Sequence, residues 1–170
     1  MVKEAVISDC GKYRYTLYRE WAEDPIFDGV RVLNFVMLNP STADGLQDDP
    51  TVRKCIGFAK FNNFNAIRVV NLFAYRSTDP KGLFTEYLSD WGDPVGPQND
   101  SYVRELPSEE TVVAAWGSTF ANQSWVQQRV RKTIELLNRK LYCLRKTKDG
   151  HPGHPVMMGY GPLMNFNETP

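Results

Sequence analysis

The chain has 170 residues, of which 42% are apolar and 24% charged, as in an ordinary single globular domain. Its net charge of zero argues against a protein that coats nucleic acid indiscriminately. No apolar run reaches the ~18 residues that a membrane span needs, and the amino terminus lacks a signal-peptide core. Three widely spaced cysteines favour a reducing cytoplasm over a disulfide framework or an iron–sulfur cluster. We therefore expect one cytoplasmic α/β domain over residues 1–170, with no membrane contact, cofactor or metal.

The first half of the chain has the pattern of strand, helix and strand. Residues 12–21 alternate apolar and polar side chains, which predicts a strand at the edge of a sheet. Residues 31–38 and 66–72 are nearly continuous apolar runs, typical of strands buried on both faces. Between them Asp49 and Pro50 are a good N-cap and first residue for a helix. A strand–helix–strand unit of this length predicts parallel strands and a right-handed crossover.

The second half continues the alternation. The predicted elements are short helices at 79–88 and 97–106, a strand at 111–116, a long helix capped by Ser124, and a strand at 140–144. Buried strands joined by helices predict a three-layer α/β/α sandwich with a mainly parallel, four-stranded central sheet.

Polar or conformationally special residues follow the apolar strands and begin the tail loop. Because the carboxyl ends of parallel strands meet at one edge, and ligands of open α/β sheets bind there, these residues predict a functional site. They are Asn39 with Pro40 and Ser41, Asn71, Trp116 with Gly117, and His154 with Pro155.

The order of these motifs resembles that of the uracil-DNA glycosylase superfamily. The matching stretches are MLNPSTAD (37–44), VVNLFAYRSTDP (69–80), VVAAWGS (112–118) and GHPGHP (150–155). The first resembles the Asn-Pro version found in the mismatch-specific branch. One departure concerns the pocket wall, because Ser41 and Thr42 follow the Asn-Pro pair where those glycosylases usually have Gly, Pro or Tyr.

As a whole, the chain is also similar to the uncharacterised domain-of-unknown-function family 1643 of bacteria and phages. That similarity covers most of the chain and includes DDPTVRKCIGFAK, DPVGPQND and HPGHPV besides the first two motifs above.

The glycosylase resemblance implies hydrolysis of the N-glycosidic bond of an unusual or modified base. Asn39 would hold the attacking water, and Asp44, Asp48 or Asp49 would place a carboxylate near the sugar cation. His154 would donate a hydrogen bond to the base as negative charge develops there.

Base recognition is expected from a second set of side chains. The Asn71 amide offers a donor and an acceptor together, which complements a pyrimidine edge. Phe73 or Tyr75 would stack on a flipped base, and Trp116 would form a further wall. The implied partner is DNA or a nucleotide.

Structural interpretations remain open beside these roles. Asn39 suits a turn, Asp49 a helix cap and Trp116 a core. His151 and His154, with Asp149, are too few for a convincing metal site. Residues 125–150 contain eight basic side chains, either a solvated helix face or a phosphate patch. The alternatives to a DNA glycosylase are a binding module of the same fold and a hydrolase of free nucleosides or nucleotides.

Overall fold

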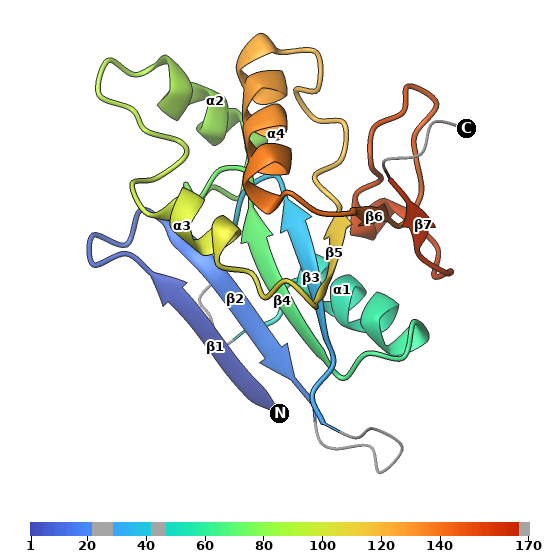
Figure 1. Ribbon diagram of the computed structural model, residues 1–170. Coiled ribbons are helices and arrows are strands. Elements are labelled where there is room, and N and C mark those ends of the chain that lie inside the picture. The colour runs from blue at the N-terminus through green and yellow to red at the C-terminus, as the bar shows by residue number, and fades with distance from the viewer. Residues whose placement is uncertain (22–28, 42–46, 167–170) are drawn as a thin grey trace.

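The computed structural model describes residues 1–21, 29–41 and 47–166, and it shows a mixed α/β fold (Figure 1). The seven strands lie in the order β1-β2-β4-β3-β5-β6-β7. They are β1 (Val2–Ile7), β2 (Arg14–Glu20), β3 (Val32–Met37), β4 (Ala66–Asn71), β5 (Thr111–Ala114), β6 (Tyr142–Cys143) and β7 (Met164–Asn165). The helices are α1 (Pro50–Phe61), α2 (Pro80–Leu88), α3 (Asn99–Arg104), α4 (Ser124–Leu137) and the 3₁₀ turn η1 (Pro155–Met157).

The sheet is mixed in strand direction. β3 runs parallel to β4 and β5, and β5 runs parallel to β6. β1 with β2, β2 with β4, and β6 with β7 are antiparallel. The prediction of four main strands with residues 12–21 added at an edge is therefore wrong in size, because the exposed strand β1 and the two-residue strand β7 extend the sheet at its two ends. The prediction that residues 12–21 form an edge strand is also wrong, since β2 lies between β1 and β4.

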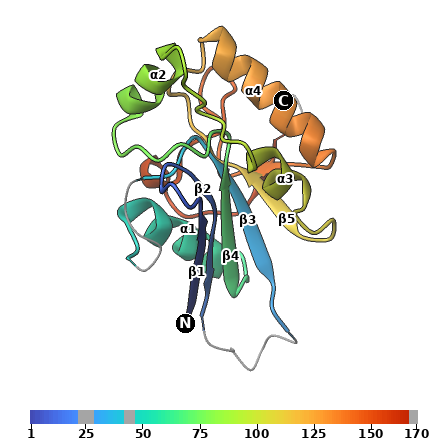
Figure 2. The same cartoon turned by 90° about the vertical axis from the view of Figure 1, so that its left-hand side faces the viewer.

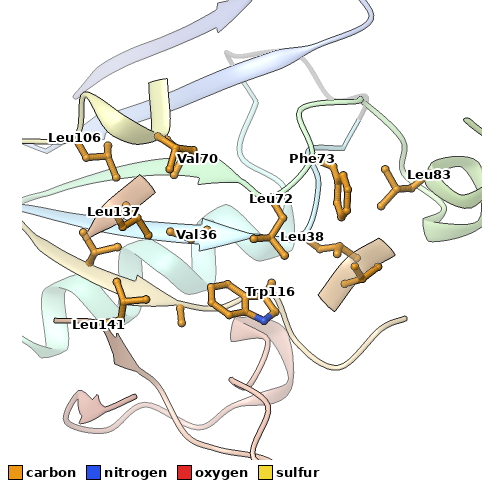
Figure 3. Packing of buried hydrophobic residues seen from close by; sticks show 14 of the residues in the cluster. Val36, Leu38, Val70, Leu72, Phe73, Leu83, Leu106, Trp116, Leu137 and Leu141 are labelled. Atoms are coloured by element: carbon orange, nitrogen blue, oxygen red, sulfur yellow. The ribbon is translucent and has the colours of Figure 1, made fainter. Parts of the chain in front are cut away.

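Helices cover both faces of the sheet. α1 packs on one face, where Val52, Cys55 and Phe58 meet Phe35 of β3 and other buried side chains. α3 and α4 cover the other face, as Figure 2 shows with the sheet seen from its side. Figure 3 shows this second core, in which Trp116 belongs to one cluster with apolar side chains of β3, β4 and the helices.

The helix that follows β3 begins where the sequence predicts. The carboxylate of Asp49 accepts a hydrogen bond from the backbone nitrogen of Val52 at 2.8 Å, and Pro50 is the first helical residue. α4 differs from expectation at its start, because Gln123 occupies the cap position and makes no side-chain cap hydrogen bond. Ser124 is already the first residue of the helix.

The strand directions position the site. The carboxyl ends of β3, β4 and β5 share one edge because these strands are parallel. β2 runs the other way, so its amino end, at Arg14, lies at that same edge. Within the described ranges, no helix is long and apolar enough to cross a membrane.

Candidate functional site

A cavity of about 250 Å³ opens at the carboxyl ends of β3, β4 and β5. The structure brings six of the predicted site residues together in its wall. They are Asn39, Ser41, Asp49, Asn71, Trp116 and His154. The residues come from separate segments of the chain, and they converge because the strands that precede them end at one edge.

Asn71, the last residue of β4, is the most unusual polar group in this wall. It is only 1% exposed, and within the described residues neither its amide nitrogen nor its amide oxygen has a hydrogen-bond partner. Its backbone is held firmly, since its carbonyl oxygen accepts a hydrogen bond from Nδ2 of Asn99 at 3.0 Å. A buried side-chain amide normally satisfies its donors and acceptors. Asn71 is therefore a residue of the cavity wall whose buried amide has an unused donor and an unused acceptor within the described residues.

Asn39 lies just beyond the end of β3, and its orientation is fixed. Its Nδ2 donates to the carbonyl oxygens of Ser77 at 2.9 Å and Pro40 at 3.2 Å. The carbonyl of Pro40 also accepts from the backbone nitrogen of Ser77 at 2.9 Å, which ties the two loops together. Asn39 thus serves the turn that its sequence context predicts. In the described part of the chain its Oδ1 makes no hydrogen bond and remains an acceptor.

Asp49 combines a structural contact with a place in the cavity wall. One carboxylate oxygen caps α1 through Val52, and the other accepts from Oγ of Ser41 at 3.0 Å. Both oxygens are therefore engaged, which holds the carboxylate still and limits its capacity to take a proton from water. Of the other two predicted carboxylates, Asp48 pairs with Arg19 at 2.7 Å and is not among the residues that line the cavity, and Asp44 lies outside the described residues.

His154 precedes the 3₁₀ turn η1, and Pro155 is the buried first residue of that turn. Nδ1 of His154 accepts a long hydrogen bond, 3.4 Å, from the backbone nitrogen of Val156, so the neutral ring carries its proton on Nε2. Burial lowers the pKa of His154, and the charge of Asp49 partly opposes this effect. Neutral His154 thus offers a single N–H donor.

Gly117 explains how the loop after β5 accommodates His154. Its φ of +75° lies in the left-handed region, and a Cβ there would lie 3.2 Å from Cβ of His154. Trp116 is nearly buried, and its ring packs edge-on against Phe166 with centroids 5.6 Å apart.

Two predicted stacking residues lie away from the cavity wall. Phe73 is buried in the core against Trp125, with ring centroids 5.0 Å apart. Tyr75 packs edge-on against Tyr13, with centroids 6.5 Å apart. The structure therefore does not bring either ring to Asn71. The apolar character that predicted stacking on a base instead reflects packing within the protein.

Arg14 lines the cavity and was not anticipated from the sequence. It is only 5% exposed, and its Nε has no hydrogen-bond partner within the described residues. Burial lowers the pKa of the guanidinium to about 10, an effect that Asp49 opposes and Arg76 and Arg19 reinforce. The missed signal was the antiparallel direction of β2, which brings the start of that strand to the edge where the parallel strands end.

The basic segment 125–150 does not form one uniform patch. Arg129 is buried and pairs with Asp100 at 2.6 Å. Arg139 donates to the carbonyl oxygens of Leu106 and Pro107. These two cations hold parts of the fold together, so they are not available to bind phosphates. Among the described residues, no group of three or more metal-ligating side chains is assembled.

The fold and the cavity define a mixed α/β domain with a candidate ligand site at the carboxyl ends of its parallel strands. The family described as Protein of unknown function (DUF1643) matches residues 14–156, so the chain belongs to that family. Comparisons with curated proteins and with solved structures find no significant match.

Proposed function

We propose that the cavity binds the edge of a pyrimidine-like base and that the protein hydrolyses the N-glycosidic bond of that base. The observation that carries this proposal is the buried Asn71 amide, whose donor and acceptor both lack partners in the described chain. A pyrimidine edge offers an acceptor and a donor side by side, which is the pattern that an asparagine side chain complements. The order of the sequence motifs, which resembles that of uracil-DNA glycosylases, supports the same function, and a glycosylase-like fold is part of this proposal.

The proposed reaction replaces one bond to the sugar by another. Water adds through its oxygen to C1′, while the C–N bond breaks and its electron pair goes to the base. The proton released by the water passes to solvent, and the base is neutralised by a proton. Oδ1 of Asn39, held in place through Nδ2, is suited to orienting that water. His154 donates from Nε2 to the base as it gains charge, and Asp49 stabilises the sugar cation.

Non-catalytic binding of a nucleobase or nucleotide is the second candidate. It is favoured by the carboxylate of Asp49, because both of its oxygens already accept hydrogen bonds. Hydrolysis by this site therefore depends on orienting water and on charge stabilisation more than on proton abstraction. Arg129 and Arg139 make contacts within the protein, so they give no reason to prefer DNA over a free nucleotide. Both kinds of substrate must therefore be compared.

The test is release of free base, measured with excess enzyme so that slow chemistry is seen. Substrates are oligonucleotides with uracil, mismatched thymine or hypermodified pyrimidines, and the matching free nucleosides and nucleotides. We expect wild type to release base, Asn39→Ala to lower the rate with little change in substrate affinity, and Asn71→Ala to weaken affinity. Base binding without release from any substrate would favour the non-catalytic candidate. No binding of any base would contradict both.

A further inference from the structure

Arg14 is a buried cation in the wall of the cavity. Its backbone nitrogen donates to the carbonyl of Ala74 at 2.9 Å, which fixes the start of β2 beside the end of β4. The side chain lines the same cavity as Asn71 and Asp49. The position of Arg14 is thus set by the sheet, and among the described residues no hydrogen bond of its guanidinium is found.

Neighbouring charged groups are already occupied. Arg19 pairs with Asp48 at 2.7 Å, and Nη1 of Arg76 donates to the carbonyl of Gly11 at 2.9 Å. Asp49 has both oxygens engaged, by Ser41 and by the amino end of α1. Within the described residues, no carboxylate forms a salt bridge with Arg14.

A purely structural arginine behaves differently in this same protein. Arg129 is also buried, but it donates to the carbonyl of Leu72 and pairs with Asp100. Burying a guanidinium without such partners is costly, because a charge removed from water needs compensation. A cavity beside the unpaired group provides the space for a compensating anion.

We infer that Arg14 binds an anionic oxygen group of the ligand, a phosphate or a carboxylate, beside the planar edge that Asn71 recognises. The guanidinium fork matches both groups in geometry and charge. The inference rests on the proposed function for its base, but the anion can be tested without one. It makes the substrate an acidic base or a nucleotide and predicts weaker binding of a neutral nucleoside.

The experiment compares pairs of probes that differ by one anionic group. Uridine is paired with uridine 5′-monophosphate, uracil with orotate, and orthophosphate is tested alone by calorimetry and thermal shift. We expect wild type to prefer at least one anionic probe by tenfold or more, as for a charge-assisted hydrogen bond. The pair that shows the preference identifies whether phosphate or carboxylate is bound. Arg14→Gln should reduce that preference to within threefold, leaving affinity for the neutral probe within threefold of wild type.

Arg131 supplies the matched control. It lies in the wall of an adjoining cavity of about 230 Å³ that shares Trp116 and Thr119 with the first. Arg131→Gln removes the same charge and should keep the anion preference. A preference absent from wild type, unchanged in Arg14→Gln, or lost in Arg131→Gln instead would overturn the inference.

The outcomes also separate this inference from the proposed function. Orthophosphate that stabilises wild type and not Arg14→Gln, with no base bound, would uphold the anion site and contradict base recognition. Bases that bind equally well with and without an anionic group would uphold base recognition and contradict the anion site. If Arg14→Gln does not fold, as judged by circular dichroism, the probe pairs on wild type and Arg131→Gln decide the matter. A preference for the anionic probe in both wild type and Arg131→Gln supports Arg14 as the anion-binding residue. Absence of that preference from wild type contradicts the inference.

Discussion

Replacing Asn71 by leucine should make the protein more stable while abolishing binding of a base. Asn71→Leu keeps a side chain of similar shape and removes a donor and an acceptor that are buried and unpartnered in the described chain. A residue kept for stability behaves in the opposite way, because it satisfies its own polar groups. The sign of the change therefore distinguishes a binding residue from a structural one.

The size of the effect follows from the two groups at Asn71. An unsatisfied buried polar group costs roughly 1–3 kcal/mol, so a donor and an acceptor together set an upper bound of roughly 2–6 kcal/mol. A leucine that fits the space imperfectly loses part of this gain. We expect Asn71→Leu to raise the free energy of unfolding by about 1 kcal/mol, or Tm by roughly 2–4 °C for a chain of this size. Urea denaturation followed by circular dichroism measures it.

Asn34 is the matched control for this substitution. It lies on the adjacent strand β3 and is 0% exposed, but its Nδ2 donates to Glu110 and to the carbonyl of Thr111, and its Oδ1 accepts from Arg68. Asn34→Leu should lower the free energy of unfolding by about 2 kcal/mol or more, because it removes hydrogen bonds to the two charged residues Arg68 and Glu110 and to the carbonyl of Thr111. If Asn71→Leu is destabilising by a similar amount, the reasoning about Asn71 is refuted.

Three further predictions concern other residues of the cavity. Asp49→Ala should lower the free energy of unfolding by about 1 kcal/mol in urea denaturation, because the N-cap of α1 is lost. Asp49→Asn should retain most of the stability that the cap provides, because asparagine is also a good N-cap residue. Gly117→Ala should cost at least ~1 kcal/mol by the same measurement, because of its left-handed φ and its approach to His154, and an unchanged stability would contradict the contact. Because burial depresses the pKa of His154 below 6.5, the unfolded chain takes up this proton more readily. Wild type should therefore lose stability relative to His154→Gln as pH falls below 6.5, with the loss levelling off below the folded pKa, and parallel pH profiles would contradict this.

The strands that end at the cavity could be predicted because burial on both faces leaves a strong signal. Residues 31–38 and 66–72 contain β3 and β4, which pair in parallel as the intervening helix requires. The polar residues after these strands converge for the same topological reason. Prediction from the sequence therefore succeeded for strands whose own residues indicate that both faces are buried.

The remainder of the sheet depends on contacts between distant segments. β1 is largely exposed and β7 has only two residues, so neither periodicity nor length marks them, whereas the predicted strand at 140–144 contains the two-residue strand β6. Arg14 was missed because its role depends on the direction of β2 relative to β4, which no local pattern encodes. The aromatic ring of Phe73 predicts stacking on a base, whereas in the structure that ring packs in the core against Trp125.

The distribution of unsatisfied groups gives the strongest argument that the cavity is a ligand site. Single unpartnered atoms occur elsewhere in the described chain, for example at Asn99, Trp125, Thr133 and one nitrogen of Arg129. Asn71 is different because both ends of its side chain are unpartnered, and it shares a cavity with the buried Arg14. Independent structural imperfections have no reason to face the same space. A ligand that pairs with both residues removes both costs at once, so the same groups that lower the stability of the free protein increase its affinity for that ligand.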